Sequence, residues 1–184
     1  MKSVLISIRP QWVEKIASGE KTIEVRKSAP KEVPFKCYIY MTQGTLKDLC
    51  DYSEYIYQNR MKVIGEFICD KVMFLTPLGL RGFEMREEIL KLSCLTNDDL
   101  NAYGGLKTLY GWHISDLKIY DRPKELREFK KTRDKIAMTC GMQARNGLCR
   151  AIDHEELCDN IKCCFKTPRP SQSWCYVEEL KNEP

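Results

Sequence analysis

The start of the chain has two alternating segments separated by a proline and a glycine, and this arrangement limits what the chain can form. Residues 3 to 9 place β-branched residues at every second position, which predicts a strand. Pro10 is favoured as the first residue of a helix, and Gly19 is favoured after its last turn, so a short helix is expected between them. Residues 21 to 27 alternate again. This second strand has Thr22, Glu24 and Arg26 on one face and Ile23 and Val25 on the other.

Further along the chain, patterns predict more strands with short helices between them. The strands are expected at residues 35–41, 61–75, 110–120 and 173–178, with Gly65 as a bulge or a point of close approach. Helices are expected at 46–57, at 83–92, after an N-cap at Thr96, and from Pro123 as a basic amphipathic helix. Regular helical crossovers are missing. The expected fold class is therefore α+β, a small mixed or antiparallel β-barrel flanked by short helices.

Composition is that of a mildly basic globular chain. The 184 residues are 43% hydrophobic, which is sufficient for one good core and predicts a single domain over residues 1–184. The net charge of +4 permits a nucleic-acid or phosphate partner without requiring one. The apolar runs are far shorter than the roughly 20 residues of a membrane span, and the run that follows Lys2 is too short for the h-region of a signal peptide, so neither is expected. No membrane partner and a cytoplasmic location are expected.

Ten cysteines are unevenly distributed. Cys37, Cys69 and Cys175 lie in expected strands, where a reduced cysteine behaves as a small buried apolar residue. Five others and His154 crowd residues 140–164, and a structural zinc held by Cys140, Cys149, Cys158 and Cys163 is one hypothesis. Paired C-x2-C knuckles are missing, so the alternative is a flexible loop with reduced thiols.

A family resemblance emerges from the segment around Gly19. Residues 6–10, 12–16 and 19–26 resemble the ASCH domain, whose most characteristic element is G-x-K-x-x-E-x-R after the first helix. Gly19, Lys21, Glu24 and Arg26 match all four positions. The likeness covers roughly residues 2–130 and 168–180 and leaves a cysteine-rich insertion at about 132–167. It implies a PUA-like barrel that recognises RNA, a nucleotide or a modified nucleoside.

The motif itself predicts a ligand site. Glu24 and Arg26 are two residues apart on a strand, so they share a face and can pair. If the first two strands are neighbours, Lys21 lies near Ser7 and Arg9 and completes a cationic cleft for an RNA or nucleotide ligand. His113, which follows Trp112, is a further candidate for ligand binding by stacking or proton transfer. The alternative for the motif is a solvated strand face with a weak surface salt bridge, and the three tryptophans are expected mainly in the core.

Two other functions stay open. Some bacterial ASCH proteins are amidohydrolases that deacylate N4-acetylcytidine with a lysine, a threonine and a glutamate. Lys21 matches the lysine, but Glu24 occupies the place of the threonine, so the hydroxyl is missing. A hydrolase of this kind, or a ribonuclease, would use Lys21 and Glu24 as its catalytic pair. A third possibility is a protein-interaction adaptor built from the basic helix and the cysteine-rich segment.

Overall fold

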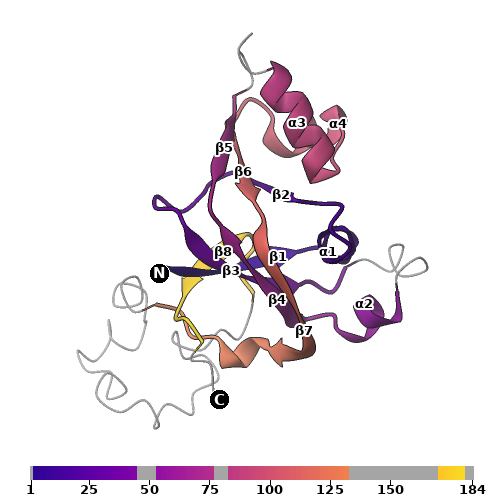
Figure 1. Ribbon diagram of the computed structural model, residues 1–184, viewed down its shortest axis with the longest axis vertical. Helices are drawn as coiled ribbons and strands as arrows, with labels where there is room; N and C mark the ends of the chain where they lie inside the picture. Colours follow the sequence, from indigo (N-terminus) through magenta and orange to yellow (C-terminus); the bar gives the residue numbers. More distant parts are fainter. Residues whose placement is uncertain (1, 45–52, 77–82, 133–169, 181–184) are drawn as a thin grey trace, which may run out of the picture.

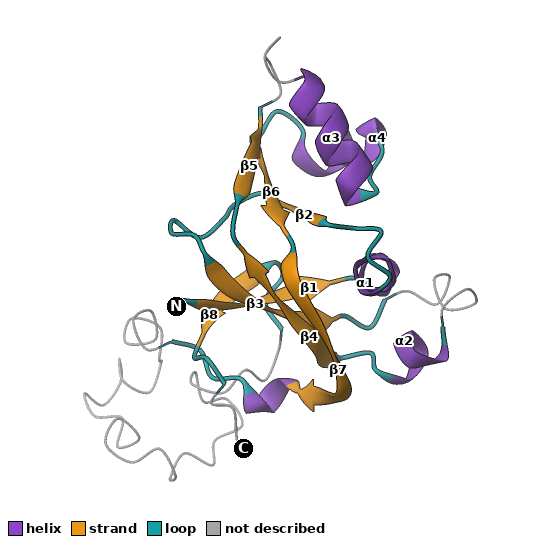
Figure 2. Ribbon diagram, in the orientation of Figure 1, coloured by secondary structure: helices purple, strands orange, loops and turns teal. Residues whose placement is uncertain are grey.

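Two β-sheets and four short α-helices make up the part of the chain that the computed structural model describes, residues 2–44, 53–76, 83–132 and 170–180 (Figures 1 and 2). The larger sheet has the order β7-β4-β3-β1-β8 and the smaller one the order β2-β6-β5. The strands are β1 (Ser3–Ile8), β2 (Ile23–Arg26), β3 (Phe35–Met41), β4 (Lys62–Cys69), β5 (Val72–Leu75), β6 (Leu109–His113), β7 (Ser115–Glu125) and β8 (Trp174–Val177). The helices are α1 (Pro10–Ala17), α2 (Glu54–Gln58), α3 (Phe83–Ser93) and α4 (Asn97–Gly104).

The predicted α+β class is confirmed, but the prediction of a barrel is wrong, because the described strands form two open sheets and do not close into a barrel. In the larger sheet β1 is parallel to β3, and the other neighbours are antiparallel. Its edge strands are β7 and β8. After β7 the chain turns into a 3-10 helix, Leu126–Glu128, and meets β8 at one isolated bridge between Lys131 and Val177. This turn interrupts the ladder, so the described strands form a curved mixed sheet beside a second, smaller sheet.

Two segments that were predicted as single long strands each divide between the sheets. Residues 61–75 form β4 in the larger sheet and β5 in the smaller one, and residues 110–120 form β6 in the smaller sheet and most of β7 in the larger one. The breaks fall at residues 70–71 and at Ile114. The alternation is interrupted at both breaks. Asp70 and Lys71 are adjacent charged residues, and after Ile114 the apolar side chains shift by one position, to Leu117 and Ile119. The interpretation as single long strands did not use these interruptions.

The helices predicted from Pro10, at 83–92 and after Thr96 are confirmed. Most of the helix predicted at 46–57 lies outside the described residues, and its described end is α2. α1 begins at Pro10 and is followed by Gly19, whose φ of 81° lies in the left-handed region that glycine favours. Thr96 caps α4 in a capping box with Asp99. The basic helix predicted from Pro123 is wrong, because β7 continues to Glu125. β7 is an edge strand, where a proline does not remove a ladder hydrogen bond. None of the described helices is long and apolar enough to cross a membrane.

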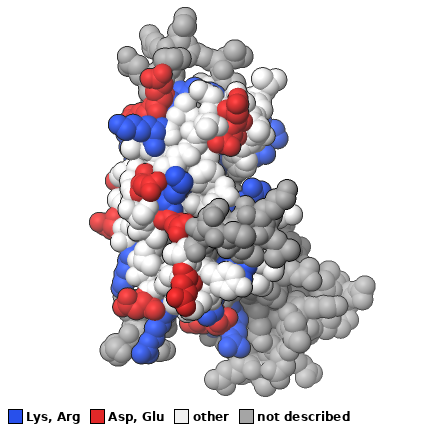
Figure 3. Space-filling view, turned by 90° about the vertical axis from the view of Figure 1, so that its right-hand side faces the viewer, with Lys and Arg blue, Asp and Glu red and all other residues white. Residues whose placement is uncertain are grey.

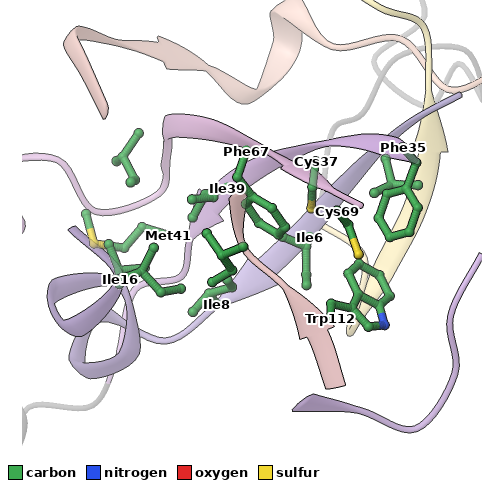
Figure 4. Close-up of a cluster of buried hydrophobic side chains, with 14 of the residues drawn as sticks. Ile6, Ile8, Ile16, Phe35, Cys37, Ile39, Met41, Phe67, Cys69 and Trp112 are labelled. Atoms are coloured by element: carbon green, nitrogen blue, oxygen red, sulfur yellow. The ribbon is translucent and has the colours of Figure 1, made fainter. Parts of the chain in front are cut away.

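The main core lies between the two sheets and under α1 (Figure 4). Trp112 from β6 is fully buried there, with its ring edge-on to Phe35 at a centroid distance of 5.1 Å. Cys37 and Cys69 are buried in the same cluster, as predicted, and burial raises the pKa of the Cys69 thiol to about 12. A second cluster, built from Ile23, Val25 and residues of β5 and β6, packs under α3 and α4. The smaller sheet therefore has one face on these helices and the other toward the larger sheet.

Gly65 is the point of close approach that the sequence predicted. The pairing of β4 with β7 shifts register between Val63 and Gly65, and a Cβ atom at Gly65 would lie 2.5 Å from the carbonyl oxygen of Lys118.

We expect Gly65→Ala to lower the free energy of unfolding by about 1–3 kcal/mol, because the backbone of β7 must move away. Urea denaturation measures this loss. The exposed Leu106→Ala serves as a control that should change stability by less than about 0.5 kcal/mol, and an unchanged Gly65→Ala would contradict the packing described.

Candidate functional site

The alternation of β2 separates an apolar face from a charged one, and both are buried. Ile23 and Val25 join the cluster under α3 and α4, while Glu24 and Arg26 lie on the opposite face of the smaller sheet. Glu24 is 5% exposed and Arg26 is 9% exposed. Lys21, just before the strand, is 2% exposed. The motif therefore does not form the solvated strand face that was its alternative interpretation.

Lys21, Glu24 and Arg26 form one charged cluster. The Nζ atom of Lys21 lies 3.3 Å from Oε2 of Glu24, and Nη2 of Arg26 lies 3.0 Å from Oε1 of the same carboxylate. One carboxylate thus pairs with two cations, which leaves the cluster with an excess positive charge. A buried charge of this kind is tolerated only where its remaining donors have partners.

Backbone carbonyl groups from two other elements supply those partners. Lys21 donates from Nζ to the carbonyl oxygen of Ser93, the last residue of α3, at 2.7 Å. Arg26 donates from Nη2 to the carbonyl oxygen of Ser7 in β1, also at 2.7 Å. The Nε atom of Arg26 is buried and has no hydrogen-bond partner in the described part of the chain. The cluster is therefore fixed from both sheets and keeps one unsatisfied donor.

Lys21 is held in an environment that disfavours its charge. Burial lowers its pKa below the ordinary value of 10.5, and the Glu24 carboxylate offsets part of this effect. The Nζ atom also lies 5.2 Å from the ring centroid of Trp12, within cation-π range. Trp12 was expected to be a core residue only. It is partly buried against the main core and in addition contacts this lysine.

The charged cluster lies at a cleft of about 720 Å³, a volume typical of ligand pockets. Five of the predicted binding residues line it, namely Ser7, Arg9, Lys21, Glu24 and Arg26. Arg9 is exposed, and its guanidinium forms no salt bridge with the residues that the structure describes. On the side of the molecule where α1 and α2 lie, acidic and basic side chains alternate over the described surface (Figure 3). The described surface on this side therefore shows no broad basic patch.

The remaining walls of the cleft come from residues that the sequence did not single out for binding. Trp12 belongs to α1, Asp99 and Tyr103 belong to α4, and residues 170–172 approach from the far end of the chain. Ser7 donates from Oγ to the carbonyl oxygen of Ser171 at 2.7 Å, which attaches this last segment to β1. Tyr103 carries no local signal beyond its position one residue before Gly104. Only the tertiary arrangement brings it to the site.

His113 is a predicted binding residue that does not line the cleft. It pairs with Ile23 across β2 and β6, so its side chain belongs to the face opposite Glu24 and Arg26. Its Nδ1 atom lies 2.7 Å from Oδ1 of Asp70, at the break between β4 and β5. This hydrogen bond lowers the pKa of the Asp70 carboxyl group. His113 therefore connects the points where the two chain segments change sheets.

The hypothesis of a zinc site concerns residues that lie outside the described part of the chain. Cys140, Cys149, Cys158 and Cys163 all belong to residues 133–169. Among the described residues, no group of three or more His, Cys, Asp or Glu side chains is placed to hold a metal ion. The described cysteines, Cys37, Cys69, Cys94 and Cys175, are free thiols. Structural zinc stays a prediction.

Comparison with known proteins identifies the fold. The sequence matches no family model and no curated protein. Among solved structures, the ASCH protein of Zymomonas mobilis superposes with a TM-score of 0.51 and 20% identity, over 68% of this chain and 74% of that one. Two mutants of the same protein give the same TM-score at 19% and 20% identity, each over 68% of this chain and over 77% and 75% of theirs. The chain therefore has the fold of ASCH-domain structures, as its motif predicted. Identity this low establishes the fold and leaves function to be argued from the site.

Removal of the Glu24 charge should weaken the whole protein. Glu24→Gln leaves Lys21 and Arg26 buried without their carboxylate, so we expect the free energy of unfolding to fall by about 3–5 kcal/mol. The pKa of Lys21 should fall further, because the group that raises it is lost. Chemical denaturation measures the first effect and NMR titration of the lysine side chains the second.

A matched control lies in the same motif. Glu20 pairs with Lys15 at 3.1 Å, but their side chains are 60% and 42% exposed, so Glu20→Gln should leave stability unchanged within error. Equal effects of the two substitutions would show that the buried cluster is not the stabilising feature proposed.

Proposed function

We propose that the chain binds RNA or a nucleotide, including a modified nucleoside, in the cleft at Lys21, Glu24 and Arg26. The observation that carries this proposal is the buried cluster itself. Two cations around one carboxylate lie at the wall of a ligand-sized cleft, where burial of their charges is costly. An excess positive charge at such a place attracts a phosphate or a carbonyl oxygen. The ASCH fold agrees with this class of ligand, although the fold alone does not decide it.

The donors and acceptors of the cleft fit such a ligand. The ammonium of Lys21 has three N–H donors, of which Ser93 and Glu24 engage two, so one is left for a ligand. Arg9 supplies an exposed guanidinium at the cleft, suited to a phosphate. Trp12 and Tyr103 supply aromatic surfaces in the same cleft, on which a base can stack. A base and one phosphate therefore each have suitable partners among the residues that line the cleft.

Binding is tested best through Arg9, because its exposed side chain can be removed without unfolding the protein. We expect Arg9→Ala to weaken binding of an RNA strand of about eight nucleotides by roughly tenfold or more, since a charged hydrogen bond contributes about 1.5–3 kcal/mol. The slope of log affinity against log salt should decrease by about 0.7, the value for one lost phosphate contact on a single strand. Fluorescence anisotropy at several salt concentrations measures both quantities.

Arg127→Ala is the matched control. Arg127 is also exposed, lies on the 3-10 helix after β7 and does not line the cleft, so its loss should leave affinity unchanged within error. Affinity should also decline as pH rises, starting below the ordinary lysine pKa of 10.5, because Lys21 loses its proton earlier than an exposed lysine. Absence of binding to RNA and nucleotides alike, or equal losses with Arg9→Ala and Arg127→Ala, would refute the proposal.

A hydrolase is the second candidate, favoured by the pairing of Lys21 with Glu24 in the cleft. In such a reaction Glu24 would take a proton from water, the resulting hydroxide would add to the acyl carbon of an N4-acylated cytidine, and the carbon–nitrogen bond would break with the proton passing to nitrogen. The Lys21 ammonium would stabilise the developing oxyanion. No threonine hydroxyl is required by this route, which fits the glutamate found at position 24.

Product analysis separates the enzyme from the binding protein. If the chain is a hydrolase, incubation with N4-acetylcytidine or labelled RNA gives cytidine or cleaved strands, and Glu24→Asp lowers the rate at least a hundredfold by moving the base away, an effect of the size of general base catalysis. Circular dichroism checks that the variant is folded. No product with either substrate at high protein concentration would exclude both activities. The adaptor hypothesis depended in part on a basic helix from Pro123, and that segment is the end of β7. No observation of the described residues supports the hypothesis in another way.

A further inference from the structure

Three residues form a row across the smaller sheet, beginning at the cleft and ending at the sheet edge. Arg26 of β2 lies opposite Tyr110 of β6, and Tyr110 lies opposite Phe74 of β5. Residues in direct register share a face of the sheet, so these three side chains follow one another on the face that carries Glu24. Arg26 lines the cleft, so the row is continuous with it.

Exposure of the row increases away from the cleft. Arg26 is 9% exposed, Tyr110 is partly buried, and Phe74 is 60% exposed at the edge strand. The neighbouring row behaves differently, because there Trp112, opposite Glu24, is fully buried against the larger sheet. The rings of Phe74 and Tyr110 meet edge to face, with centroids 5.4 Å apart. Their packing against each other fixes an exposed aromatic platform beside a cationic cleft.

We propose that this platform, Tyr110 with Phe74, binds a second nucleotide of a single-stranded polynucleotide whose neighbouring nucleotide occupies the cleft. The inference rests on the proposed function and deepens it, because it names a single-stranded polynucleotide, and not a free nucleotide, as the ligand. Phe74 lies two β-strand spacings from Arg26, about 10 Å. The base of the adjacent nucleotide in an extended polynucleotide can therefore reach Phe74 while its neighbour lies in the cleft. An exposed aromatic face accepts any base by stacking.

Charge complementarity favours a polynucleotide over an apolar peptide as the occupant. The row starts at a guanidinium, and the next residue in the chain, Lys27, is exposed with its Nζ atom 4.7 Å from the ring centroid of Tyr103. Arg9 adds a further exposed cation at the cleft. A ligand of this surface must offer bases that stack on the rings and phosphates that pair with the cations. A polynucleotide carries both groups in alternation along its chain.

The test compares a strand with its monomers. Phe74→Ala should weaken binding of a single-stranded RNA of about eight nucleotides by about fivefold to a hundredfold, the range for one lost base–aromatic stack. The same substitution should leave the affinity for the four nucleoside monophosphates unchanged, because Phe74 does not line the cleft. Phe74→Trp keeps an aromatic face and should retain affinity for the strand. Tyr57→Ala, which removes a 52% exposed aromatic ring on α2, is the matched control and should change neither affinity.

Failure of this inference can be told apart from failure of the proposed function. If the monophosphates bind as tightly as the strand, or if Phe74→Ala binds the strand like the unsubstituted protein while Arg9→Ala weakens it, the platform is not part of the site. If Arg9→Ala also has no effect, the cleft is not the site, and the proposed function fails with the platform. An equal loss with Phe74→Ala and Tyr57→Ala would likewise overturn the platform, since it would show nonspecific stacking.

Discussion

The buried carboxylate of Glu24 is the interaction on which the rest of the site depends. It pairs with two cations, Lys21 and Arg26, and each of these also donates to a backbone carbonyl group of another element. One of those carbonyls ends α3 beside the smaller sheet, and the other belongs to β1 in the larger sheet. The cluster is thus a polar connection between two sheets whose remaining contacts are mostly apolar. Without the carboxylate, two buried positive charges would face each other, so stability and the shape of the cleft depend on one group.

Much of the site was predictable from residues 3–26 because the signals there are local. A proline at a helix start, a glycine at a helix end and a two-residue alternation fix β1, α1 and β2, and therefore the common face of Glu24 and Arg26. The burial of that face was not predictable from the alternation, which is the same on a solvated strand. Residues 61–75 and 110–120 show a related limit. Their alternation is interrupted at residues 70–71 and shifts by one position after residue 114, but such an interruption alone does not show that the chain passes to another sheet there.

The differences between the structure and the sequence predictions have specific physical causes. His113 follows Trp112 directly, so its side chain lies on the other face of β6. Its position next to an aromatic residue did not indicate which of the two faces carries the cleft. Pro123 fits a helix start and an edge strand equally well, and only the pairing of β7 with β4 decides between them. Tyr103, the segment at residues 170–172 and the row from Arg26 to Phe74 come from elements distant in sequence. Long-range pairing assembles them, and no local pattern encodes it.

A nucleotide titration followed by NMR tests the central claim most directly, because it shows which of two clefts the ligand enters. The other cleft, of about 950 Å³, lies beside β7 and the C-terminal segment and is lined by described residues that include Lys118, Tyr120 and Arg122. Cytidine monophosphate added to labelled protein should shift the indole N–H signal of Trp12 and the side-chain Nε–H signal of Arg26. Backbone signals of Tyr120 should stay in place. Shifts that gather around Tyr120 while Trp12 and Arg26 are unmoved would contradict the account, and the ligand site would then lie on the larger sheet.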